Sequence, residues 1–148
     1  MITSMQKSGY EFLGDVAIAD VAFKAWGSSL EELFESAAIA LFEVMVNTKS
    51  VKFGVVKNFE LKSESIDELL YDFLSYLIFL KDTEKLFLSR FEIKIDKNEV
   101  YRLLARVYGE QIDIKKHELR VDVKAITYHL FEVKKIDDKW VAMIVVDV

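Results

Sequence analysis

The sequence of 148 residues has a net charge of −5, and 52% of its residues are hydrophobic, so it can bury one core of ordinary domain size. It contains no cysteine and only two histidines, which excludes disulfides, thiolate nucleophiles, thiolate metal sites and a multi-histidine zinc centre. Any bound metal would therefore be a hard cation that oxygen atoms hold.

The distribution of apolar and basic residues argues against a membrane or secreted protein and against a protein that binds nucleic acid by itself. No apolar run reaches the roughly 20 residues that span a membrane, and the short polar start, Met1 to Gly9, lacks the apolar core of a signal peptide. Lysine and arginine are scattered, whereas a protein that binds nucleic acid by itself usually carries a basic stripe. We therefore expect a cytoplasmic protein that has no membrane contact and meets RNA only through a partner.

The sequence also predicts a single domain. Proline is absent and glycine occurs five times, so no linker signature divides residues 1–148. Residues 1–9 are expected to be a flexible N-terminal segment, and the protein is expected to be a monomer or a weak oligomer.

The first part of the chain predicts two strands and a helix. Tyr10 to Leu13 and Asp20 to Trp26 are expected to be strands, because apolar residues dominate both. Ser29 and Glu32 form a capping box, in which each side chain satisfies a free amide at the start of a helix. Apolar residues then recur with helical spacing to about Asn47, which predicts a core helix.

The middle of the chain repeats this pattern. Strands are expected at Val51 to Val56 and at Phe59 to Lys62. A second capping box, Ser65 with Glu68, predicts a helix that runs to about Lys81. This helix is apolar on nearly every side, so we expect it to be buried on more than one side.

After Leu86 the spacing of apolar residues changes to every second position, which is typical of strands. Turns are expected at Gly109 and at Asp137 to Lys139. The further strands are expected at Val100 to Tyr108, Leu119 to Val133 and Trp140 to Val146. Early helices and late strands predict an α+β fold, with two helices packed on a mixed or largely antiparallel sheet.

Two aspartates at strand ends are candidate metal ligands. Asp20 begins a strand that is otherwise apolar, and Asp147 follows the apolar run Val141 to Val146. The sequence ends at Val148, so its α-carboxylate would lie beside the Asp147 side chain. Three carboxylates could hold calcium or magnesium, with waters and backbone carbonyls completing the shell. The alternative is that each aspartate is simply a solvated strand-end residue.

Lys124 and the two histidines are the other polar residues of interest. Lys124 shares a strand face with Ile126 and Tyr128, so it is either a lysine whose stem covers apolar surface or a cation beside the carboxylates. His129 is expected to be buried or half-buried with a hydrogen bond, and His117 to lie in a surface turn. The sequence has no phosphate-binding glycine loop, nucleophile elbow or HExxH motif, so it predicts no self-sufficient catalytic centre.

Several segments along almost the whole chain resemble the archease family. They are Tyr10 to Leu13, Ala19 to Ala22, Ser29 to Phe34 with Ala37-Ala38, Asp67 to Leu70 with Phe73-Leu74, Gly109-Glu110, Lys124 to His129 and Trp140 to Val148. The Lys-Ala-x-Thr-Tyr-His run, together with the final Asp-Val, is the most specific part of this resemblance.

The resemblance implies an α+β sandwich that assists the tRNA-splicing RNA ligase, which joins 2′,3′-cyclic-phosphate and 5′-hydroxyl RNA ends. An archease promotes guanylylation of that ligase and its multiple turnover, and it is not itself an enzyme. The family binds a divalent metal, typically Ca²⁺, and the matching positions here are Asp20, Asp147 and Val148. Lys124 corresponds by position to the family's functional lysine.

The chain departs from the family at one place. Archeases usually have His-Thr-Ala-Asp before the second strand, whereas this sequence has Ala17-Ile18-Ala19-Asp20 after a short insertion at Gly14 to Val16. Asp15 could compensate for the missing histidine. Two other functions stay open: a metal-dependent phosphoesterase or nucleotide-binding enzyme that uses Asp20, Asp147 and Lys124, and a chaperone-like interaction module.

Overall fold

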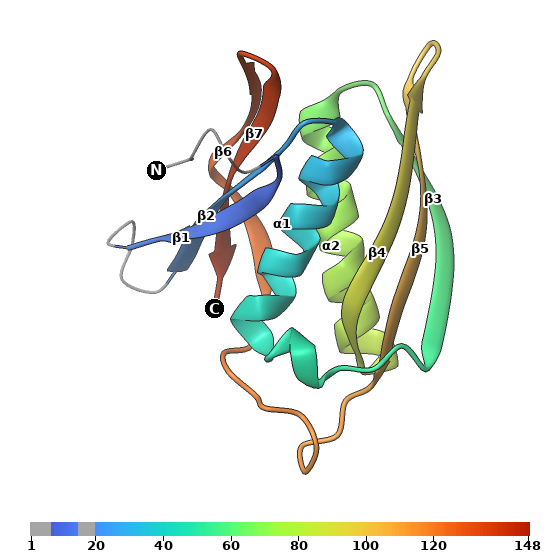
Figure 1. The fold of residues 1–148 in the computed structure, drawn as a ribbon, viewed down its shortest axis with the longest axis vertical. Coiled ribbons are helices and arrows are strands. Elements are labelled where there is room, and N and C mark those ends of the chain that lie inside the picture. Colours follow the sequence, from blue (N-terminus) through green and yellow to red (C-terminus); the bar gives the residue numbers. More distant parts are fainter. Residues whose placement is uncertain (1–6, 15–19) are drawn as a thin grey trace.

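The computed structural model describes residues 7–14 and 20–148, in which two helices lie between two β-sheets (Figure 1). The elements in chain order are β1 (Gly9–Leu13), β2 (Asp20–Gly27), α1 (Leu30–Met45), the short 3-10 helix η1 (Thr48–Ser50), β3 (Val55–Ser63), α2 (Ile66–Glu84), β4 (Leu86–Lys97), β5 (Tyr101–Gln111), β6 (Ala125–Ile136) and β7 (Lys139–Asp147). None of the helices in these ranges is long and apolar enough to cross a membrane.

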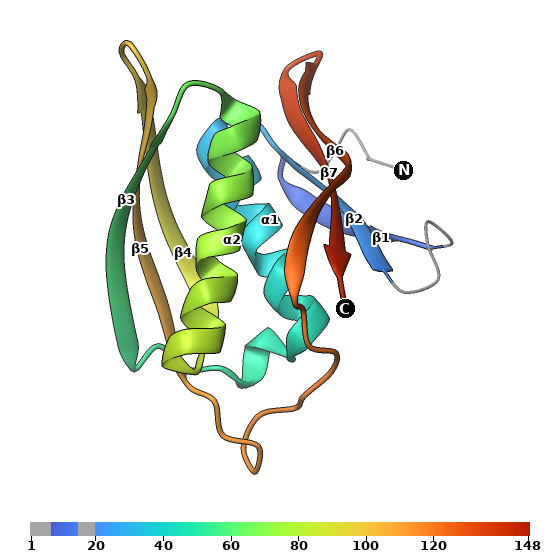
Figure 2. The ribbon, with the colours of Figure 1, turned by 180° about the vertical axis from the view of Figure 1, so that it is seen from behind.

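Both sheets are antiparallel. The strand order is β1-β2-β7-β6 in one sheet and β3-β5-β4 in the other, and each strand pair recorded in the described ranges is antiparallel. Seen from behind, α2 runs between β3 and β6, one strand from each sheet (Figure 2). The predicted α+β class, with two helices packed on antiparallel sheets, is confirmed.

Both helices begin at the predicted capping boxes. The Ser29 hydroxyl accepts a hydrogen bond from the amide of Glu32 at 3.2 Å, and the Glu32 carboxylate accepts one from the amide of Ser28 at 2.7 Å. Ser65 accepts a hydrogen bond from the amide of Glu68 at 3.2 Å, so the serine of the second capping box also caps its helix. Its end lies three residues beyond the expected Lys81, and Lys85 follows in the left-handed conformation that commonly closes a helix.

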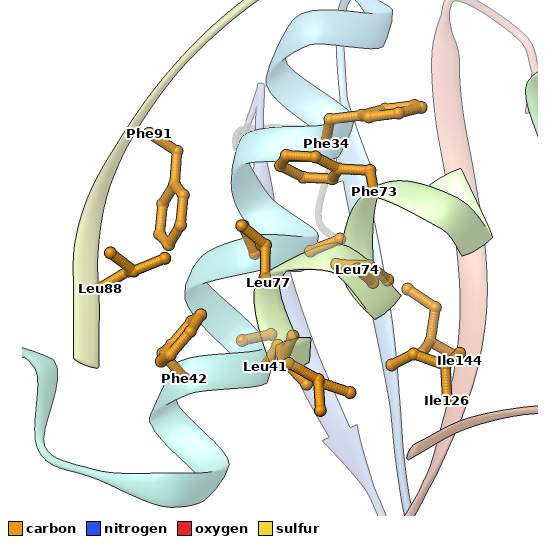
Figure 3. Packing of buried hydrophobic residues seen from close by; sticks show 14 of the residues in the cluster. Phe34, Leu41, Phe42, Phe73, Leu74, Leu77, Leu88, Phe91, Ile126 and Ile144 are labelled. Carbon is orange, nitrogen blue, oxygen red and sulfur yellow. The ribbon is translucent and has the colours of Figure 1, made fainter. Parts of the chain in front are cut away.

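The core fills the space between the helices and both sheets (Figure 3). The rings of Phe34 in α1 and Phe73 in α2 have centroids 5.5 Å apart, and those of Phe42 in α1 and Phe91 in β4 are 5.9 Å apart. The other residues labelled in Figure 3 are Leu41, Leu74, Leu77, Leu88, Ile126 and Ile144. Because α2 packs against both sheets and against α1, it is buried on more than one side, as predicted.

The three-stranded sheet differs from the prediction at two points. Of the two strands expected at Val51 to Val56 and Phe59 to Lys62, residues 51–54 form no strand, and the rest belongs to one strand, β3, which pairs with β5 without interruption. Gly109, expected in a turn, lies inside β5 beside an irregularity of β4 between Leu88 and Arg90. A Cβ atom on Gly109 would lie 1.8 Å from the carbonyl oxygen of Phe87, so this close approach of the two strands needs glycine for space and not for a turn.

The strand predicted from Leu119 to Val133 begins only at Ala125. The segment before it crosses from one sheet to the other and bonds to the end of α1, where the amides of Arg120 and Val121 donate to the carbonyls of Met45 and Val44. Leu119 and Val121 are therefore 48% and 49% exposed instead of sharing a buried strand face. The turn predicted around Asp137 is confirmed, with a positive φ of 55°.

The structure tests the predictions for the N-terminal region only in part. Residues 1–6 of the expected flexible segment, and Asp15, which was considered a replacement for the missing histidine, lie outside the described residues. Gly9, the last residue of that segment, already belongs to β1 and pairs with Trp26.

Candidate functional site

Asp20 and Asp147 lie directly opposite each other at one end of the four-stranded sheet. Asp20 is the first residue of β2, Asp147 is the last residue of β7, and the register of this strand pair matches the two positions. Directly opposed residues in an antiparallel pair have Cβ atoms about 4.5–5.5 Å apart and side chains on the same face. The fold therefore brings together two carboxylates from opposite ends of the sequence.

The face that carries this pair is the one turned away from the helices. Phe23 of β2, and Ile144 and Val146 of β7, belong to the core between the layers. Side chains alternate along a strand, so Asp20 and Asp147 lie on the opposite face, where both are half-buried. In this position the carboxylates can reach solvent or a bound cation without disturbing the core.

Lys124 reaches the same end of the sheet from the third strand. Its amide donates a hydrogen bond of 2.8 Å to the carbonyl of Asp147, and the next residue, Ala125, pairs with Asp147. The Lys124 side chain is exposed and lines a small hollow together with Tyr71, Ser75, Ile78, Ala125 and Ile126. Lys124 is thus beside the carboxylate pair through its backbone, while its side chain lies by α2.

Lys81 of α2 fixes the backbone immediately before Lys124. Its ammonium lies 2.6 Å from carboxylate oxygens of both Asp82 and Asp122, and it donates a hydrogen bond of 3.0 Å to the carbonyl of Val123. Burial alone would lower the pKa of Lys81, but the hydrogen bonds to Asp122 and Asp82 outweigh it and raise that pKa. The side chain is 5% exposed, and the sequence analysis missed it because Lys81 was expected only to mark the end of a helix.

The donor atoms at this edge suit a hard cation. Two carboxylates and nearby backbone carbonyls are oxygen ligands of the kind that Ca²⁺ and Mg²⁺ take. Over residues 7–14 and 20–148, no group of three or more histidine, aspartate or glutamate side chains gathers as a metal site. A site here would therefore need a donor besides Asp20 and Asp147, and Val148, which is half-buried against the core, stays the predicted one.

Both histidines differ from their predictions. His129 is exposed, because β6 bulges away from β7 between Thr127 and Glu132, with Leu130 at a positive φ of 57°. His117, expected in a surface turn, has a fully buried side chain. Buried and exposed histidines cannot be told apart from these segments, because the strand bulge and the fold of the crossing segment depend on distant contacts.

Glu110 is the side-chain hydrogen-bond partner of the buried His117. The Nδ1 atom of His117 accepts a hydrogen bond of 2.9 Å from the amide of Asp113, so its Nε2–H donates to the Glu110 carboxylate at 2.8 Å. Lys116 and the amide of Lys52 donate to the same carboxylate at 2.8 and 3.0 Å. This cluster anchors the start of the segment that leads to Lys124, and its only signal in the sequence was the Gly109-Glu110 match.

The Glu110 cluster predicts a dependence of stability on pH. The hydrogen bond from Lys116, followed by that from the Lys52 amide, lowers the pKa of Glu110 to about 2. Because the folded pKa lies below the unfolded value of about 4.3, the contribution is complete above that value and is lost as the pH falls toward 2. We expect Glu110→Gln to lower the melting temperature at pH 7 and the difference from the parent protein to shrink below pH 4.5. Glu64→Gln, at an exposed position, is the control, and an equal deficit for Glu110→Gln at pH 7 and pH 3 would contradict the assignment.

Comparison with known proteins places these features in a family context. The model of the Archease protein family (MTH1598/TM1083) matches residues 10–148. The protein archease of Pyrococcus abyssi is 45% identical over 132 residues, which cover 88% of this chain and 93% of the relative. The protein archease of Methanothermobacter thermautotrophicus is 42% identical over 140 residues, 94% of this chain and 98% of the relative.

Solved structures agree with the fold. The solution structure of protein 1598 of Methanobacterium thermoautotrophicum superposes with a TM-score of 0.82 at 39% identity and covers 95% of this chain and 99% of that chain. The crystal structure of an archease from Thermotoga maritima, described as a possible chaperone, gives a TM-score of 0.62 at 24% identity and covers 88% of this chain and 91% of that chain. The second likeness concerns the fold alone.

Proposed function

Because the chain belongs to the archease family, we propose that it is an accessory activator of the tRNA-splicing ligase that joins 2′,3′-cyclic-phosphate and 5′-hydroxyl RNA ends. The observation that carries this proposal is the opposed pair Asp20 and Asp147 at the sheet end, with Lys124 bonded to the backbone of Asp147. The protein acts in the cytoplasm, as a monomer or weak oligomer, and meets RNA only through the ligase.

The carboxylate pair is proposed to hold a divalent cation, most simply Ca²⁺. Two like charges in cross-strand register repel, and a cation between them would remove this cost. When bound, such a cation would supply positive charge at the phosphoryl-transfer centre of the ligase, where electrostatic stabilisation is most effective. Asp20, Asp147 and Val148 would hold it, while the Lys124 side chain lies on the α2 side of the same sheet end.

In this role the protein has no catalytic activity of its own. The residues it uses are two opposed carboxylates and a lysine that is joined to Asp147 only through its backbone. The competing hypothesis, a metal-dependent phosphoesterase, uses the same residues. Such an enzyme would hydrolyse phosphoesters without the ligase, whereas an activator has an effect only when the ligase is present.

The decisive experiment is RNA ligation with limiting ligase, with and without this protein. We expect the protein to raise the number of ligation events per ligase and the rate of ligase guanylylation. The same protein, without ligase, is incubated with nucleotides and phosphoesters in Mg²⁺ or Mn²⁺. Unchanged ligase turnover would overturn the proposal, and hydrolysis by the protein alone would favour the enzyme hypothesis.

A further inference from the structure

An exposed patch of aromatic and acidic side chains lies where α2 meets the bulge of β6. We name residues Glu68, Tyr71, Asp72, Tyr128 and Leu130 the α2–β6 patch. The rings of Tyr71 and Tyr128 stack with centroids 4.0 Å apart and an angle of 5° between their planes. Tyr128 is 65% exposed and Leu130, two residues further along the bulge, is 52% exposed.

Neighbouring residues fix the position of the Tyr71–Tyr128 stack. The hydroxyl of Tyr71 donates a hydrogen bond of 3.1 Å to the carbonyl of Ile126, and the ring of Phe131 meets Tyr71 edge-on at 5.7 Å. Leu130 adopts a positive φ of 57°, which a leucine rarely does without a structural reason. The bulge therefore presents the exposed face of Tyr128 in a fixed orientation, and rigid tyrosines are common anchors of protein interfaces.

The charged side chains of α2 beside the stack are negative, and Lys124 lies on the other side of Tyr71. Glu68 and Asp72 are exposed on α2 one helical turn apart, on the same side as Tyr71. Loss of hydration, followed by the charges of Glu68 and other neighbours that include Asp72, raises the pKa of Tyr128, so these carboxylates act on the ring. Acidic residues beside tyrosine faces attract guanidinium groups, through ion pairs and cation–π contacts.

The patch lies near the same end of the four-stranded sheet as the candidate metal centre, on the side that faces α2. Tyr71 and Ile126 also line the hollow that contains Lys124, and Ala125 in that hollow pairs with Asp147. A partner that covers the patch would therefore lie beside this end of the sheet, whose opposite face carries the carboxylates. An enzyme that binds RNA must itself present arginine and lysine, because phosphate neutralisation supplies much of its affinity.

We propose that the α2–β6 patch docks an arginine-bearing, basic surface of the partner protein and so places the carboxylate pair at the partner's active site. This inference rests on the proposed function for the identity of the partner, the RNA ligase. The acidic side chains exclude RNA itself as the occupant, since its phosphates would meet Glu68 and Asp72.

Binding and stimulation test the inference separately. Isothermal titration of the purified ligase with this protein measures docking, and half-saturation and maximal stimulation in the ligation assay measure its consequence. We expect Tyr128→Ala and Asp72→Lys each to weaken binding by at least about tenfold and to raise the half-saturating concentration equally. Maximal stimulation at saturation is retained, because the carboxylate pair is intact.

The controls separate docking from folding and from chemistry. Phe53→Ala and Asp138→Lys change exposed residues far from the patch and should bind like the parent protein, and melting curves confirm that each variant is folded. Binding of the parent protein should weaken with salt more than binding of Asp72→Lys. If the patch variants bind the ligase as tightly as the parent protein, or if they instead dissolve a homodimer, the inference is overturned. Binding through the patch without stimulation would uphold the inference and overturn the proposed function.

Discussion

Asp147→Asn is expected to abolish stimulation of the ligase and to lower Ca²⁺ affinity by at least about tenfold, because even changes to the partners of metal ligands commonly cost that much. The amide keeps the shape of the side chain and one oxygen but removes the negative charge opposite Asp20. Without metal, this variant should be as stable as the parent protein or more stable by up to about 1 kcal/mol, because like charges in cross-strand register destabilise a sheet. Loss of function with equal or higher stability is the signature of a functional residue.

The measurements are ligation with limiting ligase, isothermal titration with Ca²⁺ and thermal unfolding in the presence of a chelator. Asp138→Asn, which changes an exposed aspartate in the turn before β7, is the matched control and should leave all three unchanged. Retained stimulation and retained Ca²⁺ binding in Asp147→Asn would show that the carboxylate pair is only a solvated strand end.

Gly109→Ala is expected to cause the largest loss of stability among conservative substitutions. The new Cβ would lie 1.8 Å from the carbonyl oxygen of Phe87 and 2.8 Å from the Cα of Leu88, both of them backbone atoms of the neighbouring strand. A flexible side chain could move away, but here the β4–β5 pairing itself must shift. We expect a cost at or above the upper end of the usual 1–3 kcal/mol for overpacking, which lowers the melting temperature by about 6–12 °C.

Gly54→Ala is the matched control for this prediction. A Cβ at Gly54 meets nothing within 4 Å, so the only effect is on the freedom of the unfolded chain. Gly54→Ala should be neutral, or stabilising by about 0.4–1 kcal/mol. Thermal unfolding of both variants compares them directly, and equal melting temperatures would contradict the steric account of Gly109.

The parts of the fold that local interactions determine could be predicted. Both helix starts follow from a serine and a glutamate three residues later, and both capping hydrogen bonds are present. Gly109 was predicted in a turn because glycine suits both a turn and a close approach of two strand backbones. Only its contact with β4, which is distant in sequence, distinguishes the two. The start of β6 was misplaced for a similar reason: Leu119 and Val121 alternate like strand residues, yet the amides of Arg120 and Val121 bond to the end of α1.

The candidate site shows the same division. Asp20 and Asp147 were chosen by chemistry and by their positions at strand ends, but nothing in the sequence shows that the two strands are neighbours in register. The Lys81 anchor and the Glu110–His117 cluster could not be predicted, because each joins residues from separate elements. The metal, the ligase and the role of Val148 as a ligand stay predictions.

The position of β7 has a consequence for how the molecule matures. This strand lies between β2 and β6, so the four-stranded sheet is divided until the last segment of the sequence has been inserted. Pairing between segments so far apart in sequence is a slow step in folding, because much chain entropy is lost before the contacts form. Asp20 meets Asp147 only when this step is complete. A partner that recognises the carboxylate pair therefore engages only molecules that have finished folding, and immature chains are ignored without a separate quality check.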